Sequence, residues 1–283
     1  MNIIEAIILG IAQGLTEFLP VSSSGHLVLL QKIFNINLPS LFFDTMLHAG
    51  TLLAVFVVLW KDIWELLKRP IQKLTGFLII ATIPAVIAAL LFNDTIEEIF
   101  KSANILGWCF LITTVLLVTS ELLSRKAKND GSIKSSEKMN WFDACFIGIM
   151  QAVAILPGIS RSGATISGAL FRKLDRDFAA RFSFLLSIPA ILGALVLQTK
   201  DLLKGKASDI AEAAESASQA ALAGIEPLSV IAGTITAAIV GFFTVKFMLK
   251  IIREKSLFGF AIYTGVLGLF IIFDQFVTRF ILW

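Results

Sequence analysis

Charged residues are scarce in this sequence. Lys, Arg, Asp and Glu make up 16% of the 283 residues and hydrophobic residues make up 57%, whereas soluble domains carry about 25% charged residues. The mean hydropathy of +0.85 leaves too little polar surface for a soluble protein, so we expect a polytopic membrane protein. The formal net charge of +3 is small and predicts no nucleic-acid partner.

Cysteine and histidine are also scarce, with two residues of each. Cys109 and Cys145 lie in apolar runs, which is typical of free thiols packed between helices, and their spacing predicts neither a disulfide nor a metal site. The sequence has no P-loop and no G-x-G-x-x-G motif, so neither phosphate-binding loop is expected. Glu5 stands where a signal peptide would have basic residues, which argues against a cleaved leader.

Two polar stretches interrupt the apolar sequence, one from Glu17 to His26 and one from Pro157 to Thr165. Each breaks a helix with Pro or Gly and restarts it with Ser, a preferred N-cap residue. The arms on either side are shorter than the about 20 apolar residues that cross a bilayer, so each pair of arms is predicted to be a re-entrant helical hairpin. The predicted arms are residues 2–19, 24–34, 141–156 and 162–171.

The rest of the chain predicts an all-α helix bundle, because no stretch shows the alternation of a strand. The six predicted full spans are residues 41–60, 74–92, 105–121, 178–198, 228–250 and 257–280. Basic loops should be cytoplasmic, and these are residues 61–73, 122–140 and 246–255. The acidic loops and both termini should then lie outside. The stretch 203–227 is expected to be an outer loop with room for an amphipathic helix.

An internal repeat organises residues 1–283 into one membrane domain, with repeat one at about 1–121, repeat two at about 141–283 and the cytoplasmic loop 122–140 between them. Each repeat is a hairpin plus three spans, so the second is inverted, as in many transporters. The hairpins should therefore enter from opposite faces and meet near the middle of the membrane. Shared hairpin geometry is the alternative explanation. A shift of 138 residues aligns Gly10 with Gly148, Ile11 with Ile149, Gln13 with Gln151, Ser22 with Ser160, Ser24 with Ser162, and Gly25 with Gly163.

The residues at the two helix restarts are candidate contacts for an anion. Free backbone N–H groups and the positive end of the helix dipole favour negative charge at such a position. Ordinary helix capping is the alternative role for the serines. The candidate contacts are Ser22, Ser23, Ser24, Gly25, Ser160, Ser162 and Gly163.

Arg161 and Glu17 are ionisable residues inside apolar arms, which is costly without a partner. The planar guanidinium of Arg161 suits a phosphate, and an ion pair with Glu17 is the alternative. Gln13 lies one turn before Glu17 on the same helix face, so the two side chains could hold a divalent cation or orient a neighbouring group. A neutral, hydrogen-bonded core carboxyl is the alternative for Glu17.

Both histidines lie near the first polar stretch. His26 is three residues after Ser23, so it can share a helix face with Ser23 and serve as a base or a nucleophile. His48, at the outer end of the next span, is a candidate for indirect support of the site, and Thr165 can add a hydroxyl one turn past Arg161. A packed histidine without a chemical role is the alternative for both. The combined set predicts phosphoryl transfer or anion binding.

These residues resemble the motifs of the undecaprenyl-diphosphate phosphatase family, integral membrane phosphatases of the bacitracin-resistance type. Its (E/Q)xxxE pattern stands here as Gln13-x-x-x-Glu17, its FLPVSS(S/T)GH run as residues 18–26, and its PGxSRSxxT pattern as residues 157–165. Similarity continues through residues 182–186 and 260–263, and the match covers essentially the whole chain. Gln13 in place of an acid leaves a metal site more dependent on Glu17 and the diphosphate oxygens.

The resemblance implies hydrolysis of undecaprenyl diphosphate to undecaprenyl phosphate, which recycles the lipid carrier of cell-wall synthesis in the bacterial cytoplasmic (inner) membrane. It implies Mg²⁺ or Ca²⁺ as cofactor, a polyprenyl diphosphate lipid as substrate and a site that opens to the outer face. A homodimer is left open. The implied catalytic residues are Glu17, Ser23, His26 and Arg161, and Ser160 and Thr165 are implied substrate contacts.

Three mechanisms fit these residues. In the first, Ser23 is deprotonated by His26 and attacks the distal phosphorus, while Glu17 orients the imidazole or the metal. Direct attack by His26, and attack by water with His26 as the base, are the alternatives. A transporter or flippase of polyprenyl phosphate is the rival function, because inverted repeats and broken helices are transporter features.

Overall fold

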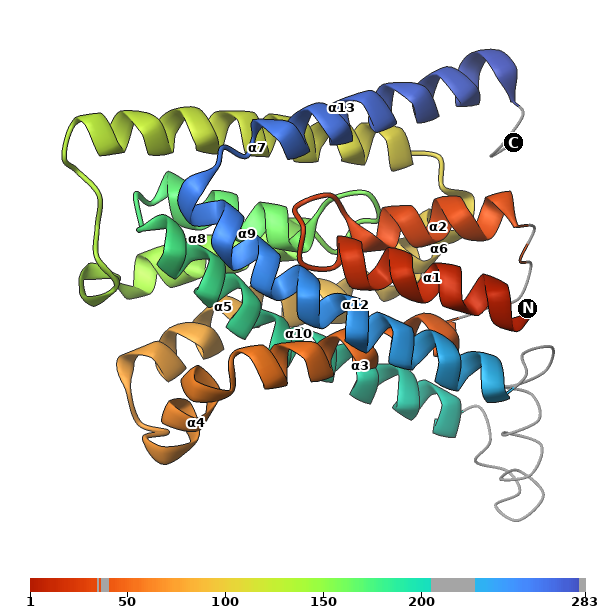
Figure 1. Cartoon of the computed structure of the whole chain (residues 1–283), viewed down its shortest axis with the longest axis horizontal. Helices are drawn as coiled ribbons and strands as arrows, with labels where there is room; N and C mark the ends of the chain where they lie inside the picture. The colour runs from red at the N-terminus through yellow and green to blue at the C-terminus, as the bar shows by residue number, and fades with distance from the viewer. Residues whose placement is uncertain (35, 37–40, 205–226, 280–283) are drawn as a thin grey trace.

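The computed structural model describes residues 1–34, 36, 41–204 and 227–279, and these are mostly helical (Figure 1). Within these ranges no strand occurs, apart from an isolated bridge between Lys134 and Leu174. A 3₁₀ turn (Ser136–Lys138) precedes α8 and a π-helical turn (Asp274–Thr278) follows α13. The helices are α1 (Ile3–Thr16), α2 (Ser23–Ile33), α3 (Leu41–Val58), α4 (Trp60–Lys68), α5 (Lys73–Leu91), α6 (Asn93–Ser102), α7 (Leu106–Asn129), α8 (Trp141–Val153), α9 (Arg161–Phe171), α10 (Arg176–Lys204), α12 (Pro227–Glu254) and α13 (Phe258–Phe273).

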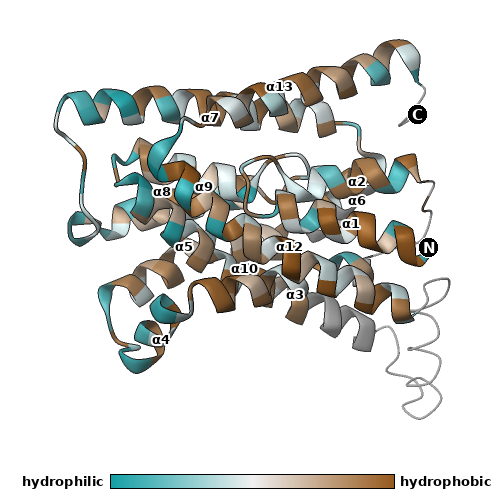
Figure 2. Ribbon diagram, viewed as in Figure 1, coloured by the Kyte–Doolittle hydropathy of each residue, from teal (hydrophilic) through white to brown (hydrophobic). Residues whose placement is uncertain are grey.

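Among the described residues, five helices are long and apolar enough to cross a membrane: α5, α7, α10, α12 and α13. The bent pair of α3 and α4 is a sixth candidate, with an angle of 79° between the two helices. Large apolar side chains are exposed on the outer faces, among them Ile79, Ile83 and Leu90 of α5, and Figure 2 shows hydrophobic residues along most of the bundle. The predicted all-α polytopic membrane bundle is confirmed.

The helix boundaries differ from the predicted spans at several places, and α12 continues to Glu254, past the predicted end at residue 250. α7 continues to Asn129, and Lys126 and Lys128 in its last turn stabilise a helix C-terminus through its dipole. The predicted loops after residues 60 and 92 contain α4 and α6, whose mixed polar and apolar faces a search for apolar spans overlooks. The predicted outer loop 203–227 lies almost entirely outside the described residues, and α10 continues to Lys204.

The two hairpins pack against helices of the opposite repeat. α1 lies along α12 and α8 lies along α5, while α3 packs on α12 and α10 packs on α5. α7 and α13 pair with each other and run side by side at the top of Figure 1. This exchange of partners supports the predicted repeat, and the inversion of its halves across the membrane stays a prediction.

Glycine allows the closest of these helix contacts. A Cβ atom at Gly10 would lie 2.5 Å from the carbonyl oxygen of Gly233, and one at Gly148 would lie 2.6 Å from the carbonyl oxygen of Ala81. Small residues let membrane helices approach each other at the backbone. Since Gly10 and Gly148 are aligned by the repeat, both hairpins use the same device to dock their first arm.

Ion pairs gather at the end of the bundle where the basic loops lie. Asp143 of α8 pairs with Lys134 and Arg172, and Glu121 of α7 pairs with Arg176. Figure 1 shows α4 and the connection from α7 to α8 at this end, on the left, and the N-terminus and the C-terminal end of α13 at the other. The arrangement agrees with the predicted topology, in which basic loops and termini lie on opposite sides.

Candidate active site

The first hairpin turn joins α1 to α2. α1 ends at Thr16, because Pro20 has no N–H group with which to continue the helix. The hydroxyl of Ser22 caps α2 by accepting a hydrogen bond from the Gly25 N–H at 3.3 Å. Ser22 has a φ of +70°, a region that non-glycine residues seldom occupy. The turn brings the side chains of Glu17 and Ser23 together.

The second hairpin turn joins α8 to α9. Gly158 has a φ of +94°, and a Cβ atom there would lie 2.7 Å from the Cβ of Cys109, so this position requires glycine. Thr113 of α7 holds the turn, because its hydroxyl donates to the Gly158 carbonyl at 3.1 Å and accepts from the Ser160 N–H at 3.0 Å. Ser160 in turn caps α9 through the Gly163 N–H at 3.0 Å.

The two turns contact each other directly. Arg161, the first residue of α9, forms an ion pair with Glu17. The hydroxyl of Ser162 donates a hydrogen bond to the carbonyl oxygen of Leu19 at 3.0 Å. The structure therefore brings together the two polar stretches that the sequence analysis singled out.

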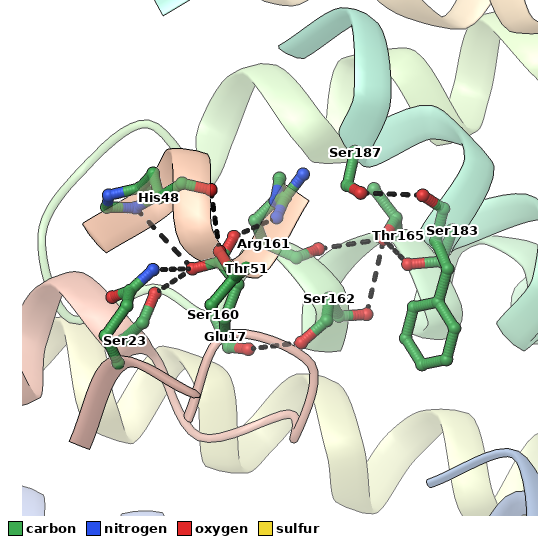
Figure 3. A network of polar contacts seen from close by, with 12 residues as sticks. Glu17, Ser23, His48, Thr51, Ser160, Arg161, Ser162, Thr165, Ser183 and Ser187 are labelled. Atoms are coloured by element: carbon green, nitrogen blue, oxygen red, sulfur yellow. Dashed lines mark hydrogen bonds and ion pairs between the residues drawn. The ribbon is translucent and has the colours of Figure 1, made fainter. Parts of the chain in front are cut away.

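Glu17 is the centre of a buried polar cluster (Figure 3). Its Oε1 atom pairs with Arg161, while Oε2 accepts hydrogen bonds from the Ser23 hydroxyl at 2.5 Å and the Gln13 amide at 3.0 Å. His48 of α3 places its Nε2 atom 3.5 Å from Oε2, and its Nδ1 atom lies 2.8 Å from the Asp44 carbonyl oxygen. The Ser23 hydroxyl is thus already oriented to give its proton to a carboxylate.

Arg161 links the two hairpins with one nitrogen of its guanidinium and leaves the other nitrogen without a partner. Nη2 pairs with Glu17, as the alternative interpretation of this residue expected, whereas Nη1 is buried without a hydrogen-bond partner. A buried guanidinium nitrogen without a partner is costly. The geometry therefore leaves one donor that a phosphate oxygen can satisfy.

His26 lies in α2, and its two ring nitrogens contact groups other than the Ser23 hydroxyl. Its Nδ1 atom is 2.7 Å from the carbonyl oxygen of Ser22, and its Nε2 atom is 2.6 Å from the hydroxyl of Tyr263. Both ring nitrogens therefore have partners, and neither partner is the Ser23 hydroxyl. The Ser23 hydroxyl contacts Glu17 instead, and the catalytic role predicted for His26 stays a prediction.

The other predicted contacts line the two turns. The hydroxyls of Ser22 and Ser24 are 3.4 Å apart, and those of Ser160 and Ser162 are 3.2 Å apart. Thr165 donates to the carbonyl oxygen of its own helix at residue 161, at 2.8 Å, and its hydroxyl lies 2.6 Å from that of Ser183 in α10. Thr165 is thus on the α10 side of Arg161.

Sequence reasoning did not single out Ser183, Thr51 or Tyr263, which all border this network. Ser183 contacts Thr165, Thr51 donates to the His48 carbonyl at 2.9 Å, and Tyr263 contacts His26. Ser183 and Tyr263 lie in the two stretches whose similarity to the family was noticed, so that similarity was the available signal. Thr51 belongs to an apolar span and carries no such signal.

The whole chain can now be compared with known proteins. It matches the model of the family described as bacitracin resistance protein BacA over residues 6–270. The chain belongs to this family. Undecaprenyl-diphosphatase 4 of Bacillus cereus is 46% identical over 280 residues, which cover 99% of this chain and 100% of the relative. Undecaprenyl-diphosphatases of Carboxydothermus hydrogenoformans and Halothermothrix orenii are 44% identical over 280 residues and 40% identical over 274, covering 99% and 96% of this chain and 100% and 98% of the relatives.

A divalent cation, Mg²⁺ or Ca²⁺, is an expectation from the sequence, and the side chains around Glu17 can be compared with it. No group of three His, Cys, Asp or Glu side chains in the described part of the chain could hold a metal. Gln13, however, is fully buried, and its Oε1 atom has no hydrogen-bond partner beside the Glu17 carboxylate. Two protein oxygens fit Mg²⁺, which usually takes its other ligands from substrate phosphates and water.

Proposed function

We propose that this protein hydrolyses undecaprenyl diphosphate to undecaprenyl phosphate and inorganic phosphate. The observation that carries the proposal is the hydroxyl of Ser23 donating to Glu17 at 2.5 Å while Arg161 occupies the other carboxylate oxygen. A nucleophile, an acceptor for its proton and a cation for the phosphate therefore stand within one buried cluster. The relatives named undecaprenyl-diphosphatase match almost the whole chain, which supports the same substrate.

The diphosphate head binds between the two hairpin turns. Arg161 turns from Glu17 to the phosphate oxygens, and its buried Nη1 atom gains the partner that it lacks. The free N–H groups at the starts of α2 and α9 add partial positive charge on either side. Since these donors are fixed in a site of low dielectric constant, they stabilise the charge that develops during phosphoryl transfer.

Ser23 attacks the distal phosphorus and passes its proton to Oε2 of Glu17. A bond forms between Oγ of Ser23 and phosphorus, the bond from phosphorus to the bridging oxygen breaks, and undecaprenyl phosphate leaves with that oxygen. A water molecule then attacks the phosphoserine. As the water oxygen bonds to phosphorus, the bond from phosphorus to Oγ of Ser23 breaks and Glu17 returns its proton to that oxygen. Both water protons leave with the inorganic phosphate, one on the new hydroxyl and one on a second phosphate oxygen.

Gln13 and Glu17 would hold a divalent cation together with oxygens of the diphosphate. When bound, Mg²⁺ or Ca²⁺ supplies charge neutralisation for the phosphate groups. The unpartnered Oε1 atom of Gln13 supports this assignment.

The prenyl chain lies in an apolar groove between α3, α4, α5 and α10. The groove has a volume of about 530 Å³. α3 and α10 also border the active site, through His48 and Ser183, so a lipid whose head is held there can lay its chain along the same two helices. Residues lining the groove include Phe56, Leu78, Ile83, Val86, Leu185 and Ile188.

The protein lies in the bacterial cytoplasmic membrane with its active site open to the outer face. Both termini are outside in this arrangement, since the basic segments 61–73, 122–140 and 246–255 should stay in the cytoplasm. The position of the N-terminus and the α13 end opposite α4 in Figure 1 supports this orientation. Undecaprenyl diphosphate released at the outer face is then recycled where it arises.

Phosphate release by the purified protein in detergent tests the function. Detergent offers no second compartment, so a transporter would release no phosphate, whereas the enzyme should release one phosphate per undecaprenyl diphosphate. A chelator should stop the reaction and Mg²⁺ should restore it. Acid quenching during turnover should trap phosphate on Ser23. An adduct on His26, or full activity of Ser23→Ala, would contradict the mechanism, and absence of phosphate release by the folded protein would contradict the function.

A further inference from the structure

Ser22 is held in a backbone conformation that its own residue type does not favour. It has φ +70° and ψ +95° and is almost completely buried. Conformations of this kind persist only where the surroundings enforce them. Because Ser22 directly precedes Ser23, its backbone decides where the Ser23 hydroxyl points.

The carbonyl oxygen of Ser22 accepts the backbone N–H of His26 at 3.2 Å. The ring of His26 adds a second contact to this oxygen, and Tyr263 contacts the ring. The carbonyl oxygen of Ser22 can only accept, so the Nδ1 atom of His26, 2.7 Å away, carries a proton. In the neutral ring the Nε2 atom is an acceptor, and the Tyr263 hydroxyl, 2.6 Å away, is its donor. The rings of His26 and Tyr263 are also stacked, with 5.7 Å between centroids and 7° between planes.

We propose that His26 and Tyr263 are positioning residues that clamp Ser22 and thereby aim Ser23 at Glu17. Tyr263 fixes the tautomer and the orientation of the His26 ring, and the ring fixes the Ser22 carbonyl. Phe110 of α7 supports the ring edge-on, with 5.5 Å between centroids. The proposal rests on the proposed function, because it assumes that Ser23 is the nucleophile.

The clamp also explains the placement of the sole tyrosine of the chain. Tyr263 is about half exposed on α13, so its hydroxyl is not needed to fill the core, yet it makes a short bond to a residue 237 positions earlier. A histidine that acted as the base would keep one nitrogen for Ser23. In the clamp, both nitrogens are used to hold the turn.

Substitutions of His26 separate a clamp from a base. His26→Asn can keep an amide N–H near the position of Nδ1, whereas His26→Leu loses both bonds at similar volume. We expect His26→Leu to lower kcat by about 10- to 100-fold, as misplacement of a reacting group does, with little change in KM. His26→Asn should retain most of the activity although it cannot act as a base, and neither variant should change the shape of the pH profile.

A double-mutant cycle tests whether Tyr263 acts through His26. Tyr263→Phe alone should lower kcat by about 10-fold, but it should have no further effect in the His26→Leu protein, because coupled residues are not additive. Thr264→Val is the control, since Thr264 lies next on α13 and bonds Thr114 of α7 at 2.9 Å. It should leave kcat unchanged. Thermal unfolding of each variant checks that it is folded.

Two results would overturn the clamp. One is the loss of a limb of the pH profile in both His26 variants, with His26→Asn as inactive as His26→Leu, because His26 would then be the base. The other is an additive effect of Tyr263→Phe on His26→Leu. Phosphate trapped on Ser23 in all active variants keeps these outcomes distinct from a failure of the proposed function, in which Ser23→Ala would remain active.

Discussion

The two hairpin turns are built alike but carry different side chains. In both, a serine caps the second arm through the N–H group three residues later, at 3.3 Å for Ser22 and 3.0 Å for Ser160. Both turns contain a residue with positive φ, and both are held from the pair of long helices α7 and α13. Thr113 of α7 bonds the second turn, and Tyr263 of α13 bonds His26 above the first.

The difference lies in the reactive groups, which the two turns divide between them. The first turn supplies a hydroxyl and a carboxylate, while the second supplies a guanidinium. A capping serine therefore occurs in both turns, whereas each reactive group occurs in only one of them. The repeat aligns Glu17 with Ile155, Ser23 with Arg161 and His26 with Ala164.

The largest effect should come from the hydroxyl of Ser23, which has no counterpart in the second turn because the repeat places Arg161 there. Ser23→Ala should lower kcat by about 10⁴-fold or more, as removal of a nucleophile does in other hydrolases, and should abolish the trapped phosphoenzyme. Ser24→Ala is the matched control on the same turn, because the Ser24 hydroxyl meets Ser22 at 3.4 Å and does not contact Glu17. It should change phosphate release by less than about 3-fold. Equal losses in the two variants would mean that the turn, and not the Ser23 hydroxyl, is what matters.

The guanidinium of the second turn should come next. Arg161→Lys keeps the charge but loses the planar fork, so we expect kcat/KM to fall by about 100-fold, since the two side chains are not interchangeable at such sites. Arg161→Gln should lose more and should also destabilise the protein, because Glu17 would stay buried without its cation. Steady-state phosphate release and thermal unfolding measure the two effects. A Lys variant with wild-type kcat/KM would show that Arg161 serves only as a structural ion pair.

The sequence was sufficient to predict both hairpins and their meeting. The four observed arms begin and end within three residues of the predicted ones, because Pro20, Gly158 and the capping serines are local signals. The ion pair of Arg161 with Glu17 was only the alternative to a phosphate contact, and it was open to prediction because each charge is costly in an apolar environment without a partner. The amphipathic helices α4 and α6 were missed because they are neither long nor uniformly apolar.

The orientation of His26 could not be predicted from its spacing. The spacing of three residues places the side chains of Ser23 and His26 on neighbouring parts of one helix face. The His26 ring, however, contacts the carbonyl oxygen of Ser22 and the hydroxyl of Tyr263. No local pattern indicates a partner that lies 237 residues away. His48 was expected to support the site indirectly, and the structure places it 3.5 Å from Glu17.

A smaller effect is expected from a change in the groove proposed to hold the prenyl chain, because the hairpin turns bind only the diphosphate head. Ile83→Trp should fill the groove between α3, α4, α5 and α10 and raise KM for undecaprenyl diphosphate by about 10-fold, equivalent to about two methylene groups losing burial. KM for farnesyl diphosphate should stay the same, because its short chain does not extend along the groove. Ile239→Trp, in the smaller groove of about 250 Å³ between α3 and α12, is the control and should affect neither substrate. Equal changes with both substrates would place the chain elsewhere.

The smallest effects should come from two glutamines that the repeat aligns. Gln13 donates to Glu17 at 3.0 Å, whereas Gln151 donates to the Ala81 carbonyl oxygen at 3.3 Å, and each has a buried Oε1 atom without a partner. Gln13→Leu should lower kcat about 5-fold, because one hydrogen bond to a charged group is worth about 1.5–3 kcal/mol and only part of it is realised in the transition state. The same variant should raise the Mg²⁺ concentration needed for half-maximal rate. Gln151→Leu removes the unpartnered oxygen together with its amide, so the unfolding free energy should change by less than about 1 kcal/mol and the rate should not change. If the two variants behaved alike, the unpartnered oxygen of Gln13 would be a feature of hairpin packing, and the cation would depend on Glu17 and the diphosphate alone.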